Sequence, residues 1–287
     1  MNIQNTNKPL NQTIDKLICL FQKKEFNTLI KIAKEKIEEF PKSFELYNLL
    51  GITFAKIKKK EEAIKYYKKA LTVNPKNCVS DFYLGSLYHD CNDLIKAIKH
   101  YKKSTNLNPE YLNAWFNLGV AYYEHKKPLE AINSYKKVIT IDPKHANTLY
   151  NLGYVYHSLL NYDQSIVYYK LAIQINCNFE HSYSNIAKVF MDKGDYKNSL
   201  RYYKLALKKS PNDEKVNNEV GVLLTNLNHH DAALVYFEKA LTINPKSIKA
   251  KFNTSSALKD IGKYKQAKDL LYEIIDNKPN YLKAYLK

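Results

Sequence analysis

The residue types that most often carry catalysis or metal binding are present, but their spacing suits neither. The eight histidines are scattered, no H-E-x-x-H motif occurs, and no histidine stands at metal-ligand spacing from a cysteine or carboxylate. The chain also has no G-x-S-x-G nucleophile motif and no glycine-rich phosphate loop. We therefore predict that the protein is not an enzyme, with no catalytic residues, no metal site and no cofactor.

The four cysteines are predicted to be reduced thiols. They are Cys19, Cys78, Cys91 and Cys177, and no two of them form a C-x-x-C pair. Cys78 and Cys91 would stand at opposite ends of one helix, about 20 Å apart at a rise of 1.5 Å per residue, whereas a disulfide needs Cα atoms within roughly 7 Å. Reduced, mostly packed thiols are typical of a cytoplasmic protein.

The polar N-terminus lacks an apolar signal core, and no apolar run approaches the roughly 18 residues of a membrane span. We therefore expect a cytoplasmic location and no membrane span. The formal net charge of +17 comes almost entirely from lysine, because Arg201 is the only arginine. Arginine is the side chain that best binds phosphate or guanine bidentately. Lys, Asn, Ile and Tyr all have A/T-rich codons, so genome composition can explain the charge, and nucleic acid is the less favoured partner.

A period of 34 residues predicts the elements that would position any site. Seven of the nine prolines fall on one register, and five glycines lie 24 residues before the proline places. Small residues and, four places later, aromatic residues form two further series. The prolines are Pro41, Pro75, Pro109, Pro143, Pro211, Pro245 and Pro279; the glycines are Gly51, Gly85, Gly119, Gly153 and Gly221; the aromatics are Tyr67, Tyr101, Tyr135, Tyr169, Tyr203 and Phe237.

The fourth repeat carries a full set of signature residues at fixed spacing, which are Trp115, Leu118, Gly119, Tyr122, Ala131, Tyr135 and Pro143. The chain therefore resembles the tetratricopeptide repeat family. The resemblance implies an all-α, right-handed solenoid of eight 34-residue helix-turn-helix units. We divide the chain into a disordered tail (1–9), a degenerate first unit (10–43), the units 44–77, 78–111, 112–145, 146–179, 180–213, 214–247 and 248–281, and residues 282–287, which begin a truncated ninth unit or form a capping helix.

Within the fourth unit we predict helix A over residues 112–125 and helix B over 128–140. Pro128 fits the first turn of helix B, where a missing N–H has no cost. We expect Gly119 to be small because helix B approaches closely there, with Ala131 facing it and Tyr135 filling the space toward the next unit. One hairpin cannot bury its apolar face alone, so stability must come from stacking on neighbours.

Members of this family usually hold a ligand along the A helices, which line the concave wall. The place two residues before the glycine projects into that groove, and the four asparagines found there are Asn117, Asn151, Asn185 and Asn253. Glu219 interrupts the series. An amide can both donate to and accept from a peptide backbone, and the series is similar to the asparagine ladder in the repeat arm of protein O-GlcNAc transferases. Composition is the competing explanation, since asparagine is common throughout the chain.

Aromatic residues near the same groove are candidate anchors for a bound segment. They are Phe82, Phe116, Tyr150 and Tyr154. Packing between repeats explains them equally well. We add Lys188 to the peptide-binding set. The groove charges as a whole are of both signs, which argues against a nucleic-acid track.

These patterns favour a protein–protein interaction scaffold that binds an extended peptide or protein segment in the concave groove. Two alternatives stay open. The chain could be the substrate-recruiting arm of a glycosyl- or sulfotransferase whose catalytic domain is not in this chain, or a basic RNA-binding repeat protein. The partner is predicted to be another protein or peptide of unknown identity. The C-terminal end is a candidate for self-association, because apolar residues of the last unit would be only partly covered there.

Overall fold

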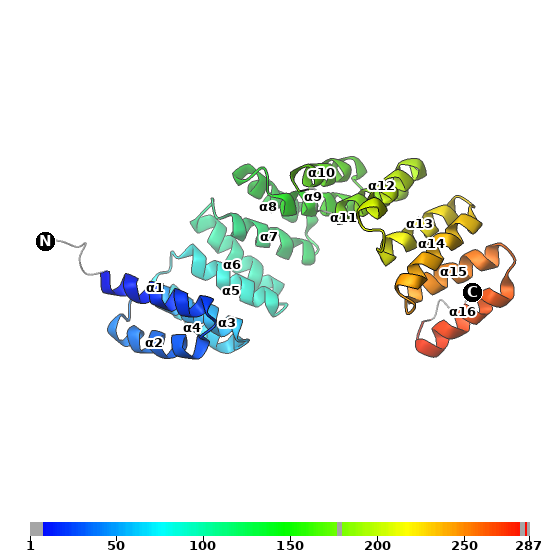
Figure 1. Cartoon of the computed structure of the whole chain (residues 1–287). Coiled ribbons are helices and arrows are strands. Elements are labelled where there is room, and N and C mark those ends of the chain that lie inside the picture. Colours follow the sequence, from blue (N-terminus) through cyan, green and yellow to red (C-terminus); the bar gives the residue numbers. More distant parts are fainter. Residues whose placement is uncertain (1–7, 177–179, 282–284, 286–287) are drawn as a thin grey trace. The chain divides into compact units, whose positions relative to one another are not determined.

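The structure is a computed structural model that describes residues 8–176, 180–281 and 285; these form sixteen α-helices and no strand (Figure 1). The A helices are α1 (Lys8–Gln22), α3 (Phe44–Lys56), α5 (Cys78–Asp90), α7 (Leu112–Glu124), α9 (Ala146–Ser158), α11 (Glu180–Asp192), α13 (Glu214–Asn226) and α15 (Ile248–Asp260). The B helices are α2 (Phe26–Glu39), α4 (Lys60–Val73), α6 (Leu94–Leu107), α8 (Pro128–Ile141), α10 (Tyr162–Ile175), α12 (Tyr196–Lys209), α14 (His230–Ile243) and α16 (Tyr264–Asn277). The predicted all-α fold is confirmed. None of the described helices is both long and apolar enough to cross a bilayer.

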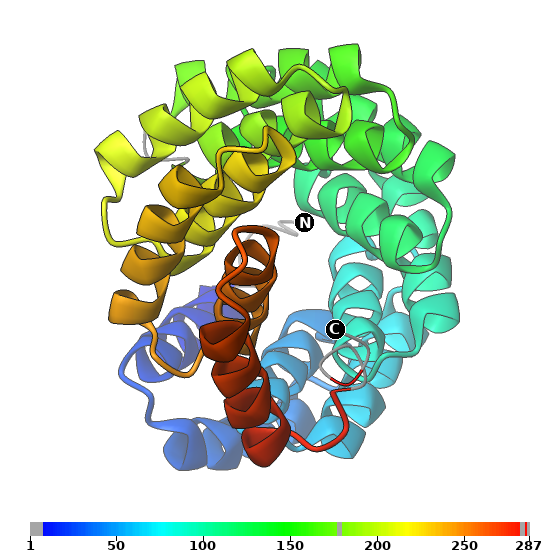
Figure 2. The same ribbon diagram turned by 90° about the vertical axis from the view of Figure 1, so that its right-hand side faces the viewer.

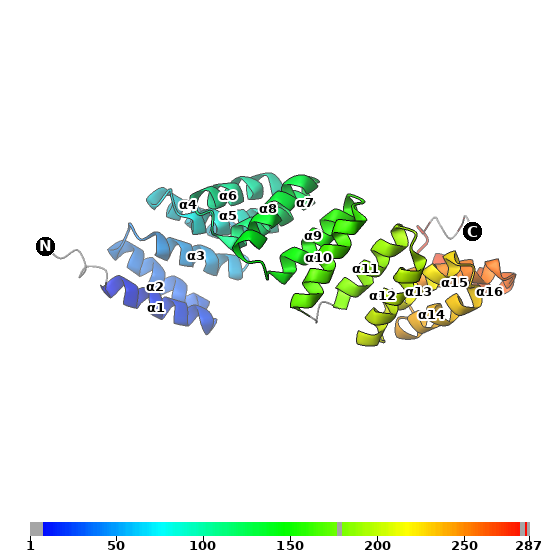
Figure 3. The same cartoon turned by 90° about the horizontal axis from the view of Figure 1, so that it is seen from above.

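The hairpins fall into two compact bodies, residues 1–148 and residues 149–287, each considered by itself. In the N-terminal body, α2, α4 and α6 pack on the A helix of the next hairpin, and α1, α3, α5 and α7 contact one another in series (Figure 2). In the C-terminal body, α10, α12 and α14 pack in the same way on α11, α13 and α15 (Figure 3). Each hairpin thus buries its apolar face against a neighbour.

The turn between helix A and helix B contains one residue with left-handed backbone in every hairpin, with φ between 59° and 83°. These residues recur every 34 places and are Lys24, Lys58, Asn92, Lys126, Leu160, Gly194, Asn228 and Gly262. Glycine adopts this conformation without steric cost, whereas a side chain such as that of Leu160 is strained there. The turn therefore explains the two glycines that lie off the main glycine register.

The glycines of the main register lie under an aromatic ring of their own hairpin. A Cβ added to Gly119 would lie 2.5 Å from Cε1 of Tyr135, and the other four glycines of this register meet the equivalent ring at 2.4–2.8 Å. We expected Ala131 to face Gly119, but the group nearest to an added Cβ is the Tyr135 ring. The expected contact of this aromatic series with the next hairpin is found for Tyr67, which stacks on Tyr83 of α5 with centroids 5.8 Å apart. The small size of glycine is needed because a ring, not a methyl group, packs on the helix backbone there.

The exposure of two cysteines and the start of the first helix differ from the predictions. Cys19 and Cys91 are exposed, so the expectation of mostly packed thiols is wrong for them; Cys78 is half-buried, and Cys177 lies outside the described residues. The first helix begins at Lys8, two residues before the predicted start of the array. The rest of the predicted tail, residues 1–7, and nearly all of the predicted ninth unit also lie outside the described residues.

Candidate binding site on the A helices

Two of the predicted asparagines connect successive A helices. Asn185 Nδ2 donates to the Tyr150 hydroxyl at 2.8 Å, which joins α11 to α9. Asn253 Nδ2 donates to Asn218 Oδ1 at 2.9 Å, which joins α15 to α13. One N–H of each amide therefore holds neighbouring hairpins together. These residues are part of the array's own bonding as well as candidate ligand contacts.

Asn117, in the N-terminal body, contacts a buried tyrosine. It hydrogen-bonds with the hydroxyl of Tyr101, as does Ser86. Burial raises the pKa of Tyr101, and these two hydrogen bonds offset part of the rise. The remaining predicted asparagine, Asn151, lies half-buried on α9.

The aromatic candidates divide into packed and exposed side chains. Three are half-buried and pack against the helix-B tyrosine of their own hairpin, which favours the packing explanation for them. Tyr154 on α9 differs, because it is 49% exposed. The ring pairs, with their centroid separations, are Phe82–Tyr101 (5.9 Å), Phe116–Tyr135 (6.0 Å) and Tyr150–Tyr169 (5.4 Å).

Three predicted residues meet at one open cavity in the C-terminal body. Tyr150 from α9 and Asn185 and Lys188 from α11 line a cavity of about 340 Å³. This volume is enough for a side chain of a bound segment. The other lining residues are Ser184, Tyr203, Asp213, Lys215, Val216 and Glu219.

The two carboxylates at this cavity are already bonded. Glu219 Oε1 accepts a hydrogen bond from Lys249 Nζ at 2.5 Å. Asp213 caps the N-terminus of α13, where its Oδ1 accepts from the Val216 N–H at 3.1 Å. Lys188 and Lys215 are exposed, and neither makes a hydrogen bond or ion pair with any described residue.

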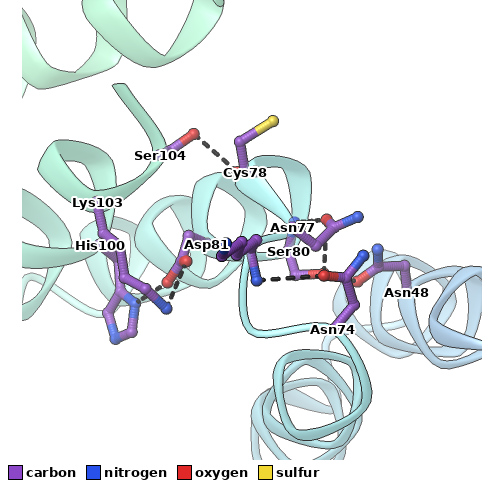
Figure 4. A network of polar contacts seen from close by, with 10 residues as sticks. Asn48, Asn74, Asn77, Cys78, Ser80, Asp81, His100, Lys103 and Ser104 are labelled. Carbon is purple, nitrogen blue, oxygen red and sulfur yellow. Dashed lines mark hydrogen bonds and ion pairs between the residues drawn. The ribbon is translucent and has the colours of Figure 1, made fainter. Parts of the chain in front are cut away.

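Sequence reasoning missed a buried charged group in the N-terminal body. Asp81 of α5 is fully buried; its Oδ1 lies 2.9 Å from His100 Nδ1, and its Oδ2 lies 2.9 Å from Lys103 Nζ (Figure 4). Both partners come from α6 of the same hairpin. Asp81 occupies the place that Trp115 and Leu149 have in the next two repeats. An aspartate at this place was the available signal. The network pairs the Asp81 carboxylate, which would be costly to bury without partners.

Comparison with known families identifies the fold. Models of the tetratricopeptide repeat match residues 44–77, 112–145 and 146–176, and two further models with the same description match 182–215 and 215–247. A model described as TPR repeat matches residues 85–126. The chain belongs to the tetratricopeptide repeat family.

Similar proteins support the repeat fold of this tetratricopeptide chain. A TPR repeat-containing protein of Borreliella burgdorferi is 35% identical over 65 residues, which are 23% of this chain and 26% of that protein. The chain therefore matches only about a quarter of that relative's length. The crystal structure of MamA is 28% identical with a TM-score of 0.57, over 60% of this chain and 94% of MamA. YrrB, described as a TPR protein with an unusual peptide-binding site, is 20% identical with a TM-score of 0.55, over 66% of this chain and 97% of YrrB. At that identity the likeness to YrrB concerns the fold alone.

Proposed function

We propose that this tetratricopeptide chain binds an extended segment of another protein along its A helices. The repeats themselves support a role as a protein-interaction scaffold. The observation that carries the finer proposal is the cavity at which Tyr150, Asn185 and Lys188 meet. It lies on three consecutive A helices, α9, α11 and α13, so a ligand there contacts more than one hairpin.

The spacing of the helices suits an extended ligand. Packed helices lie about 8–10 Å apart, and an extended chain advances about 3.3–3.6 Å per residue. About every third residue of a bound segment would therefore meet a new A helix. Amide side chains on those helices offer both donors and acceptors to its backbone.

Site-specific photo-crosslinking tests the proposal. Tyr154 on α9, which is 49% exposed, is replaced by benzoylphenylalanine, and a matched variant carries it at Val167 on α10, which is 47% exposed. After irradiation in a lysate of the source organism, we expect cross-linked proteins that are specific to position 154. If position 167 gives the same proteins in the same yield, or position 154 gives none, the A-helix proposal is wrong.

A further inference from the structure

The Tyr203 hydroxyl lacks an internal partner. Tyr203 of α12 lines the cavity on α9, α11 and α13 and is only 1% exposed, yet its hydroxyl has no hydrogen-bond partner among the described residues. Buried hydroxyls are nearly always hydrogen-bonded, because leaving one unpaired disfavours the folded state. A group of this kind at the wall of an open cavity points to a partner supplied by a ligand.

The same place three repeats earlier is occupied by Tyr101, whose hydroxyl is bonded to Ser86 and Asn117. Around Tyr203, the places of Ser86 and Asn117 hold Lys188 and Glu219. The two neutral groups that satisfy Tyr101 are thus replaced by two charged ones. Of these, Glu219 is held by another residue, as described above.

The packing under the two rings differs as well. An added Cβ at Gly85 would lie 2.8 Å from Cδ1 of Tyr101, so that ring lies directly on the α5 backbone. The equivalent place under Tyr203 holds Ala187, which is fully buried. Because the Ala187 methyl already fills this volume, the Tyr203 ring cannot lie on α11 in the same way.

Three donors that line the cavity have no partner among the described residues. Lys188 and Lys215 carry unpaired ammonium groups, while the carboxylates accept from Lys249 and from a backbone N–H. Burial, followed by the nearby charges of Glu219 and Asp192, raises the pKa of Tyr203. The hydroxyl therefore keeps its proton at neutral pH and can donate it. A ligand group that matches three donors must be rich in acceptors.

We propose that this cavity binds an oxyanion of the docked segment, with the Tyr203 hydroxyl and the ammonium groups of Lys188 and Lys215 as its donors. The oxyanion is a carboxylate of an acidic side chain or a phosphoryl group on a side chain, which share this chemistry. Charge-assisted hydrogen bonds to such groups are shorter and stronger than neutral ones. The inference rests on the proposed function, because it specifies one residue of the segment that the A helices bind.

Oriented peptide libraries provide the test. The full chain is immobilised and exposed to decapeptide mixtures that are random except for a central Glu, Gln, phosphoserine or Ser. We expect the glutamate or phosphoserine mixture to be retained about tenfold more than its neutral counterpart, as one charge-assisted bond predicts. The Glu and phosphoserine arms distinguish the two sources of the oxyanion. Equal retention of Glu with Gln and of phosphoserine with Ser overturns the inference but leaves peptide binding intact, whereas no retention of any mixture overturns both.

Matched variants separate this cavity from the general positive charge of the chain. The double variant Lys188→Gln/Lys215→Gln should abolish the preference, while Lys136→Gln/Lys137→Gln, which removes the same charge from exposed lysines of α8, should keep it. Tyr203→Phe should lower retention of the preferred mixture about tenfold without lowering the melting temperature. If both lysine pairs reduce the preference equally, the attraction is nonspecific and the inference is wrong.

Discussion

Tyr101 in the N-terminal body and Tyr203 in the C-terminal body occupy the same place in helix B of their hairpins, yet only Tyr101 has a bonded hydroxyl. Both rings are buried, so the difference lies in the A-helix residues around them. The contrasting sets are Gly85, Ser86 and Asn117 around Tyr101, and Ala187, Lys188 and Glu219 around Tyr203. The tyrosine ring packs within the hairpin in both cases. The neighbouring A-helix residues differ, and they determine whether the tyrosine hydroxyl has an internal hydrogen-bond partner.

The same two hairpins differ in their buried charge. The third hairpin buries Asp81 with His100 and Lys103, and the equivalent places in the sixth hold Tyr183, Tyr202 and Leu205. The Tyr202 ring stacks on Phe190, with centroids 5.4 Å apart. One hairpin therefore relies on a paired charge where the other relies on ring packing. Four predictions, from the largest effect to the smallest, test these contrasts.

Asp81→Ala should lower the free energy of unfolding by about 3 kcal/mol, because it removes a fully buried side chain together with its contacts to His100 and Lys103 and leaves a cavity. His100→Gln and Lys103→Ala should each cost less, because each variant leaves Asp81 one of its two partners. Urea denaturation followed by circular dichroism measures all three. A loss below about 1 kcal/mol for Asp81→Ala would show that the network is not stabilising.

Gly85→Ala should cost about 2 kcal/mol, because the new methyl group overlaps the Tyr101 ring. The reverse change in the other hairpin, Ala187→Gly, should cost about 1 kcal/mol from lower helix propensity alone. The same denaturation experiment compares them. If Gly85→Ala proves neutral or stabilising, the ring does not depend on the missing Cβ, and this part of the contrast fails.

Tyr101→Phe should cost about 1 kcal/mol, because Ser86 and Asn117 lose their partner. Tyr203→Phe should be neutral or stabilising by up to about 1 kcal/mol, because it removes an unpaired buried hydroxyl. Thermal melts of the two variants beside the unmodified chain are sufficient. A destabilised Tyr203→Phe would mean that the hydroxyl has an internal partner after all.

Leu160→Gly should stabilise the chain by about 0.5 kcal/mol, since glycine relieves the strain of a left-handed residue but adds entropy to the unfolded chain. Lys126→Gly in the N-terminal body should have a similar effect, because both residues have φ near 60° in equivalent turns. Melting temperatures provide the measurement. Opposite signs for the two variants would show that the turns of the two bodies are not equivalent.

The helical hairpins were predictable from the sequence because their boundaries depend on local residue types. Pro128 begins α8 as predicted, and α7 ends at Glu124, one residue from the predicted end. The partner of Gly119 was not predictable by the same reasoning. Spacing shows that a glycine and a tyrosine recur together, but it does not show on which helix surface the ring lies.

The candidate site was predictable only in part. Tyr150 and Asn185 were chosen from their repeat places and Lys188 from the groove charges, and all three line one cavity. The role of Tyr203 was missed because its place in the aromatic series is fully explained by packing. The residues around its hydroxyl come from two neighbouring A helices, and only the three-dimensional structure shows that none of them pairs with it. The amide bonds between A helices likewise depend on side-chain geometry that spacing does not determine.

The most direct test of the account is a double-mutant cycle between Tyr203→Phe and a Glu→Gln change at the central position of the tightest peptide from the glutamate library. Isothermal titration of the four combinations gives the coupling free energy between the Tyr203 hydroxyl and the carboxylate. We predict a coupling of at least about 1 kcal/mol, as expected for a hydrogen bond to a charged group. Additive effects of the two changes would contradict the claim that the Tyr203 hydroxyl donates a hydrogen bond to an oxyanion of the bound segment.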